Sequence, residues 1–266
     1  MTVDFHSHTS ESDGTLSPAQ LAAAMRRRGV SVFSITDHDT LRAYDNLRIE
    51  GARLIPGIEI NTTWKGNDVH ILGYGLPLGP SPIAETLDAN RGHRRARVDR
   101  MIAQLAAAGY PLTVEAVLAE SGGGHALGRP HVAKALVRAG HVADVAAAFR
   151  TLLARGGAGY VPSHHITPLE AIGVISRCGG VPVLAHPGRL KDEAILDELA
   201  AQGLVGLEVF YPTHVPHQVA HYRAKAAHYG LVMTGGSDFH DPRWNVRGVG
   251  MEVDEDDIRP FLELVA

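Results

Sequence analysis

The sequence has a single cysteine, Cys178, among its 266 residues, which excludes an intramolecular disulfide. It also has no apolar run close to the ~20 residues that a helix needs to span a bilayer. Its first residues follow an apolar strand pattern and lack the basic region and apolar core of a secretion signal. These absences predict a cytoplasmic protein that does not associate with membranes.

An excess of positive charge is also missing. The 25 Lys and Arg residues are outnumbered by 29 Asp and Glu, so the formal net charge is -4. This argues against a generally basic nucleic-acid-binding protein, although a local group of arginines can still bind phosphates. With 45% apolar residues, the chain can bury the core of one α/β barrel or two small domains. Histidine is abundant instead, with sixteen residues, and it is the commonest metal ligand and a frequent acid or base.

Strand and helix patterns alternate in the first 80 residues and again after residue 160. Ser17 and Pro18 provide an N-cap and a first-turn proline for a helix over residues 19–28. The turn sequence at 65–68 predicts a hairpin between the strands on either side. Strands are expected at 2–6, 30–36, 54–59, 68–75, 181–185, 206–211 and 231–235, and further helices at 168–178, 192–202 and 216–229.

Residues 81–160 differ in character, because their pattern is almost wholly helical. Helices are expected at 83–108, 114–120, 131–139 and 144–155, separated by glycines and prolines. We interpret this stretch as an inserted helical subdomain within a barrel formed by residues 1–80 and 161–266. An insertion beside the mouth of a barrel often controls access of the substrate, so a lid or substrate-binding role is expected.

Histidines and carboxylates gather at the expected strand ends. His6 and His8 occupy alternate positions, which an extended chain directs to the same side. The carboxyl ends of parallel barrel strands converge on one face, where active sites lie. Imidazoles suit borderline divalent metals and carboxylates can bridge two ions, so two or three ions and hydrolysis of a phosphate ester are expected. The nine candidate ligands are His6, His8, Asp13, His38, Glu59, His70, His186, Asp238 and His240.

These motifs, in this order, closely resemble the polymerase and histidinol phosphatase (PHP) family. The resemblance covers the chain except for the helical insertion, and it implies a distorted (β/α)7 TIM-like barrel with two or three metal ions, usually manganese, zinc or iron. The motifs are Asp4-Phe5-His6-Ser7-His8 with Asp13-Gly14, Thr36-Asp37-His38-Asp39, Gly57-Ile58-Glu59, His70, Ala185-His186-Pro187 and Ser237-Asp238-Phe239-His240.

The resemblance also implies how the ligands are shared. One ion would be held by His6, His8, Glu59 and Asp238, and a second by Asp13, His38 and His240. Glu59 would bridge to a third ion, held by His70 and His186. Some relatives have histidine where this chain has Asp13, which makes the second site more tolerant of manganese or magnesium. A metal-bound hydroxide held by Asp13, His38, Glu59 and His240 is expected to attack phosphorus.

Within the family, the helical insertion and Gly128-Arg129-Pro130-His131 resemble the branch that acts on nucleotides. The expected activity is removal of the 3′-phosphate of nucleoside 3′,5′-bisphosphates to give the 5′-monophosphate. The alternatives are a 5′-to-3′ exoribonuclease on short 5′-phosphorylated RNA, a histidinol-phosphate phosphatase and a non-catalytic metal-binding module. No G-x-S-x-G elbow is present, and Cys178 has no evident base beside it, so serine and thiol mechanisms are not expected.

Several basic residues are candidates for binding substrate. Arg129 precedes Pro130 at an expected helix start, where free N–H groups favour phosphate, and Lys134 lies one turn on. Arg94 and Arg97 share a helix face, for which solvent exposure is an equally good interpretation, and Arg189 follows His186. Glu208 is interpreted as a structural carboxylate or an outer-shell partner of a ligating histidine. The other histidines are interpreted as surface or packing residues, with His164 or His165 able to contact substrate.

Overall fold

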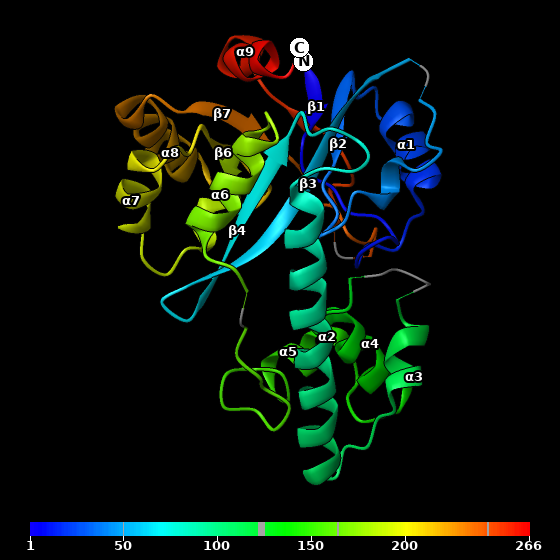
Figure 1. Ribbon diagram of the computed structural model, residues 1–266. Helices are drawn as coiled ribbons and strands as arrows, with labels where there is room; N and C mark the ends of the chain where they lie inside the picture. The colour runs from blue at the N-terminus through cyan, green and yellow to red at the C-terminus, as the bar shows by residue number, and fades with distance from the viewer. Residues whose placement is uncertain (50, 122–125, 164, 244) are drawn as a thin grey trace.

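The computed structural model describes residues 1–49, 51–121, 126–163, 165–243 and 245–266. Eight strands in these ranges form one sheet in the order β7-β6-β5-β4-β3-β2-β1-β8 (Figure 1). They are β1 (Thr2–Asp4), β2 (Val32–Ile35), β3 (Arg53–Trp64), β4 (Asn67–Tyr74), β5 (Val181–Leu184), β6 (Gly206–Phe210), β7 (Val232–Gly235) and β8 (Met251–Glu252).

The sheet curls into a nearly closed barrel, which confirms the predicted distorted TIM-like fold. The segments that follow β1 and β7 bring its two sides together. The Asp238 N–H donates to the His6 carbonyl at 2.8 Å, and the His8 N–H donates to the Phe239 carbonyl at 2.8 Å. This pairing places the residues after β1 directly beside those after β7.

The predicted hairpin is present, since a tight turn joins β3 to β4, and β4 runs antiparallel to both β3 and β5. Two other features of the sheet differ from the sequence expectation, the first being that β3 continues past Glu59 to Trp64. Glu59 and His70 therefore lie within long strands and not at strand ends. The sequence does not predict β8, since this strand has only two residues and forms solely by pairing antiparallel with β1.

Four helices pack on the outside of the barrel, namely α1 (Pro18–Arg27), α6 (Pro168–Arg177), α7 (Ile195–Ala201) and α8 (Pro216–Tyr229). The unpredicted α9 (Glu255–Leu264) lies at the end of the barrel that carries the two termini (Figure 1). The α1 capping box at Ser17 is present as expected from the sequence. In the main core Phe5, Tyr74 and Phe261 are fully buried, and the Phe261 ring packs against Phe5 at a tilted angle and against Tyr74 edge-on. In the described ranges, no helix is both long and apolar enough to cross a membrane.

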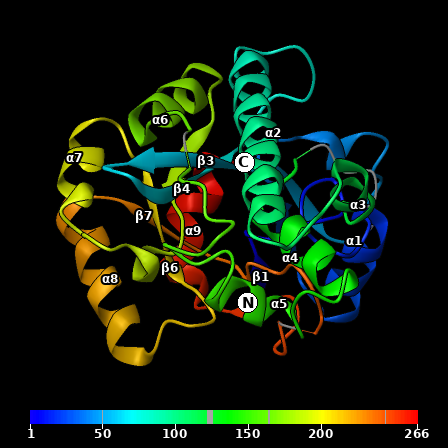
Figure 2. The same cartoon turned by 90° about the horizontal axis from the view of Figure 1, so that it is seen from below.

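The remaining helices lie together between β4 and α6 in the chain. They are α2 (Ile83–Ala107), α3 (Val114–Ala119), α4 (Arg129–Arg138) and α5 (Val145–Arg150). They share a hydrophobic cluster of their own that includes Val98, Leu105 and Leu136. α5 ends earlier than the predicted residue 155, because the chain turns at Thr151. Figures 1 and 2 show these helices at one end of the barrel, the end opposite the two termini.

Candidate metal centre

Four buried side chains converge at the end of the barrel that faces the inserted helices. His6 Nε2 and His8 Nε2 lie 3.2 Å apart, and Glu59 Oε2 is 3.2 and 3.1 Å from them. Asp238 Oδ1 is 3.4 and 3.3 Å from the same two nitrogens. Ligand atoms arranged tetrahedrally about 2.0–2.1 Å from an ion are ~3.4 Å from one another. The spacing of the four atoms therefore fits one divalent ion.

Neighbouring residues hold two of these side chains, His6 and Asp238, in place. Glu208 Oε1 lies 2.9 Å from His6 Nδ1, so the imidazole donates there and directs Nε2 toward the cluster. The other Glu208 oxygen accepts from the His186 N–H at 2.7 Å. Tyr211 donates its hydroxyl to Asp238 Oδ2 at 2.7 Å. Glu208 is thus an outer-shell partner, as the sequence indicates, whereas the role of Tyr211 in orienting Asp238 has no sequence signal.

A second set contains Asp13, His38 and His240, and the structure adds His8 to it. Asp13 Oδ1 is 3.3 Å from His240 Nε2 and 3.9 Å from His8 Nδ1, and Asp13 Oδ2 is 3.8 Å from His38 Nε2. His8 Nδ1 is buried without a hydrogen-bond partner in the described structure. A buried polar atom of this kind is costly unless something binds it, so a cation between these groups fits the site. His8 has one ring nitrogen facing each set.

A third set brings His38, Glu59 and His70 together. Glu59 Oε1 lies 2.7 Å from His70 Nδ1 and 3.1 Å from His186 Nε2. Its other oxygen lacks a hydrogen-bond partner in the described structure, although three imidazole nitrogens lie within 3.2 Å. Glu59 therefore sits between the first and third sets, at the place where a bridging carboxylate is expected.

The carboxylates of the site stay ionised in spite of their burial. Burial by itself would raise the pKa of Asp13, but the facing imidazoles of His240 and His38 outweigh it and hold this pKa well below its usual value. Burial opposes ionisation of Glu59 and Asp238 in the same way, and the surrounding histidines hold both pKa values well below normal. Three ionised carboxylates, those of Asp13, Glu59 and Asp238, are thus available as ligands for divalent cations.

Arg94 was expected on the substrate side, but the structure places it in a buried ion pair. Its Nε donates to Asp39 Oδ2 at 2.7 Å, and Asp39 has no exposed surface. Asp39 follows the ligand candidate His38 directly and has a φ of 53°. Asn90 of the same helix donates to Asp39 Oδ1 at 2.9 Å. Arg94 is therefore better interpreted as positioning the loop that carries His38.

Asn61 extends this network to the cluster. Its side-chain amide donates to Asp39 Oδ2 at 3.1 Å and lies 3.0 Å from His38 Nδ1. Arg91 also donates to the Asp39 carbonyl at 2.9 Å. Helix α2 thus attaches the inserted helices to the loop after β2 through three polar side chains.

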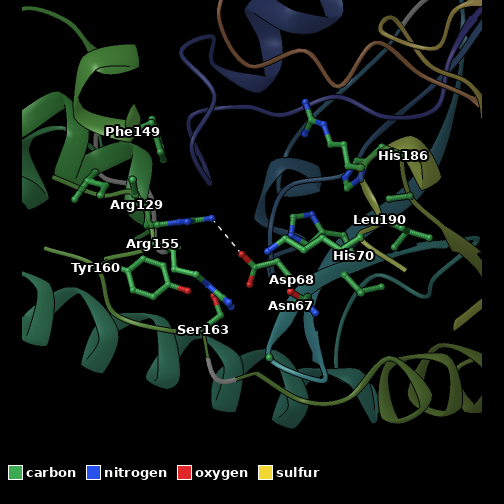
Figure 3. A pocket seen from close by; sticks show the side chains of 17 residues that line it. Asn67, Asp68, His70, Arg129, Phe149, Arg155, Tyr160, Ser163, His186 and Leu190 are labelled. Carbon is green, nitrogen blue, oxygen red and sulfur yellow. Dashed lines mark hydrogen bonds and ion pairs between the residues drawn. The ribbon is translucent and has the colours of Figure 1, made fainter. Parts of the chain in front are cut away.

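A cavity of about 390 Å³ adjoins the third set (Figure 3). His70 and His186 form one side of it, and Arg129 with Phe149 form the side contributed by the inserted helices. Arg129 begins α4 as predicted and pairs with Asp68 at 3.1 Å. The cavity is strongly basic, since it is also lined by Arg155, Arg189 and Lys191. The sequence gives no sign that Arg155 lines this cavity.

The other two predicted basic residues lie near this region but not in the cavity lining. Lys134 Nζ is 3.5 Å from the Asp13 carbonyl, beside the second set. Arg97 donates through Nε to the Val161 carbonyl at 2.9 Å. Burial, together with the nearby Arg129, lowers the pKa of Arg97 to about 10. Arg97 thus binds the backbone of a segment next to the cavity and does not line the cavity itself.

One other histidine differs from the expectation, and two cannot be compared with it. His214, predicted to be solvated on a helix, precedes α8 and bonds to the Val209 carbonyl and the Gly188 N–H. It thereby fixes the turn η2 (Pro187–Arg189) after His186. His165 is buried, and His164 and His125 lie outside the described residues.

The barrel, the histidine–carboxylate cluster and the adjoining basic cavity together define a metal-dependent phosphoesterase. The chain is 36% identical over 250 residues to the 5′-3′ exoribonuclease Rnm of Salmonella typhimurium, covering 90% of this chain and 85% of that protein. It is 34% identical over 259 residues to the 3′,5′-nucleoside bisphosphate phosphatase of Chromobacterium violaceum, covering 93% and 90%. The chain belongs to the PHP family.

A solved structure agrees with this assignment. A protein of Bifidobacterium adolescentis, described as a metal-dependent phosphoesterase, superposes with a TM-score of 0.84 at 32% identity, covering 98% of this chain and 95% of that one. No family model matches the sequence. The sequence resemblance to the PHP family is confirmed by these relatives.

Proposed function

We propose that this protein hydrolyses the 3′-phosphate of nucleoside 3′,5′-bisphosphates, such as adenosine 3′,5′-bisphosphate. The observation that carries the proposal is the basic cavity beside the cluster, which can bind a second phosphate while the first lies among the ligand candidates. Water would attack phosphorus, the bond from phosphorus to O3′ would break, and O3′ would take up a proton. The products are inorganic phosphate and the 5′-monophosphate.

The residues of the chain divide into three roles in this reaction. His6, His8, Asp13, His38, Glu59, His70, His186, Asp238 and His240 would hold two or three divalent ions. Such ions supply Lewis-acid polarisation of the phosphoryl group and a water of low pKa. Glu208 and Tyr211 orient His6 and Asp238. Arg129, Arg155 and Arg189 would bind the 5′-phosphate, so that binding energy remote from the reacting atoms positions O3′.

We propose manganese as the ion, because each set mixes imidazoles with carboxylates. Zinc, iron and magnesium are the alternatives, and metal analysis of the purified protein decides among them.

We also propose that residues 81–160 act as a substrate-binding lid, since Arg129, Phe149 and Arg155 line the cavity from that side. The enzyme would work in the cytoplasm on a nucleotide, with no partner protein required.

A direct comparison of substrates tests the proposed function. Enzyme reconstituted with manganese is given adenosine 3′,5′-bisphosphate or a 5′-phosphorylated short RNA, and release of phosphate or nucleotide is measured. We expect rapid release of phosphate from the bisphosphate, since both of its phosphates have binding groups. No release from the bisphosphate at any metal loading would contradict the proposal.

The second candidate function is that of a 5′-to-3′ exoribonuclease. It breaks the same bond between phosphorus and O3′, but the departing phosphate remains attached to the downstream nucleotide. A further cavity on the far side of the cluster, next to Asp238 and His240, favours this candidate. Histidinol phosphate fits less well, because its amine would enter a cavity that already has four cationic side chains.

Replacing Arg129 by alanine is expected to weaken binding of the 5′-phosphate without affecting the chemistry of hydrolysis at the other phosphate. A charge-assisted bond to phosphate contributes about 1.5–3 kcal/mol, so kcat/KM for the bisphosphate should fall roughly 10- to 100-fold. A small aryl phosphate lacks the 5′-phosphate and should lose little. Arg138→Ala, on the exposed side of the same helix α4, is the matched control. Equal losses on both substrates would contradict a role in binding the 5′-phosphate.

A further inference from the structure

A second cavity lies against the cluster on the side away from the first. It has a volume of about 380 Å³, and Asp238 and His240 form its inner end, whereas the first cavity meets His70 and His186. Its walls come from the loop after β6 and the loop after β7. Arg189 lines both cavities and lies 3.3 Å from Asp238 Oδ2. A phosphate among the ligand candidates would thus have a hollow on each side.

The second cavity continues along the surface, away from the cluster. It shares Arg247 and Gly248 with a neighbouring hollow of about 440 Å³, which reaches Arg28. That hollow in turn shares Arg28 and Arg247 with a third, of about 280 Å³, which reaches Arg27 at the end of α1. The three hollows adjoin through these shared lining residues, and we call them together the arginine groove; they bring together the loop after β7 and helix α1.

The charges of the arginine groove are unevenly distributed. Arginines succeed one another along it in the order Arg189, Arg247, Arg28 and Arg27. Beyond the cluster, Glu252 is the acidic residue among its described lining residues. Arg27, Arg28 and Arg247 are exposed, and the described structure gives none of the three an ion-pair partner. A protein with a net charge of -4 therefore presents a local row of positive charge that starts at its reaction site.

A row of this kind matches the backbone of a single-stranded nucleic acid. Proteins that bind single strands follow the backbone with a positively charged groove. A bisphosphate ends at the scissile phosphate and cannot reach Arg28 or Arg27. A strand attached to that phosphate would enter the second cavity and continue past Arg247. The two arginines of α2 that the sequence offers for binding substrate do not form such a row, because Arg94 is buried against Asp39 and Arg97 donates to the Val161 carbonyl.

We propose that the arginine groove binds the downstream strand of a 5′-phosphorylated single-stranded RNA, whose 5′-nucleotide occupies the first cavity. The inference rests on the proposed cleavage at O3′ and extends it to phosphodiesters. Cleavage of the bond between phosphorus and O3′ releases a nucleoside 5′-monophosphate and leaves the phosphate on the downstream strand. That strand keeps a 5′-phosphate and is again a substrate.

The test varies substrate length and removes charge from the groove. Oligoadenylates of two, four and six nucleotides with a 5′-phosphate are compared with adenosine 3′,5′-bisphosphate across a range of salt concentrations. For wild type, we expect kcat/KM to rise with length and to fall with salt. In the double variant Arg28→Gln, Arg247→Gln, the ratio of hexanucleotide to bisphosphate kcat/KM should fall roughly tenfold. The salt slope should become shallower by about 0.7 for each phosphate that an arginine no longer neutralises.

A matched control and a binding measurement make the test decisive. Arg259→Gln removes an exposed arginine of α9, outside the groove, and should leave the length dependence unchanged. Binding of a fluorescent 5′-phosphorylated hexanucleotide by anisotropy in EDTA reports on the groove without hydrolysis. Equal affinity of wild type and the double variant would overturn the inference, whatever happens to hydrolysis. Failure to hydrolyse the bisphosphate would count against the proposed function alone.

Discussion

Replacing His8 by alanine is expected to lower turnover by at least about 10³-fold, because several kcal/mol of transition-state stabilisation by metal would be lost. His8 Nε2 lies within 3.3 Å of the other three atoms of the first set, and Nδ1 faces Asp13 of the second. One substitution therefore removes a ligand from two sets. Metal content by mass spectrometry should fall together with kcat.

Thermal unfolding shows whether His8→Ala loses activity because it no longer binds metal or because it no longer folds. A ligand that binds only the folded state stabilises it in proportion to the logarithm of its concentration, so manganese should raise the Tm of wild type. In His8→Ala this increase should be much smaller. His217→Ala removes an exposed histidine of α8 and should behave as wild type in both measurements. Retention of metal and turnover in His8→Ala would contradict our assignment of the centre.

Replacing Arg94 by methionine is expected to lower the free energy of unfolding by about 3–5 kcal/mol, the cost of removing one partner of a buried ion pair. Asp39 would keep its bonds from Asn61 and Asn90 but would lack a compensating charge. Because Asp39 adjoins His38, the variant should also bind metal more weakly. Urea denaturation and metal titration measure the two effects.

The neighbouring Arg95 provides the control for this prediction. It is about half exposed and pairs with Asp99 one turn along the same helix, so Arg95→Met should cost less than ~0.5 kcal/mol. A double-mutant cycle with Asp39→Asn isolates the coupling between Arg94 and Asp39. If Arg94→Met and Arg95→Met were equally stable and bound metal equally well, the positioning role of Arg94 would be wrong.

Much of the centre could be predicted because its ligand candidates come from short local motifs. His6 and His8 follow a strand at alternate positions, and the hairpin of β3 and β4 follows from the turn at residues 65–68. A barrel brings such motifs to one end whatever the details of packing. The sequence therefore indicates the members of the sets, although it gives none of the distances between them.

Long-range polar contacts could not be predicted in this way. Arg94 and Asp39 are 55 residues apart, and a helix with several arginines gives no sign of which one turns inward. The sharing of His8 between two sets depends on the ring orientation, which the chain pattern does not specify. The arginine groove joins Arg28 to Arg247, two distant positions that the pairing of β8 with β1 brings together.

The closure of the barrel also determines when the protein can acquire its metal. The first set needs Asp238, which follows Glu59 in the chain by about 180 residues. At roughly 5–20 residues per second, a ribosome takes about 10–40 s to make that interval. During this time the nascent chain has three of the four members of the first set, His6, His8 and Glu59. A complete first set would thus form only after Asp238 has been synthesised, and the ions available at that stage would influence which metal is bound.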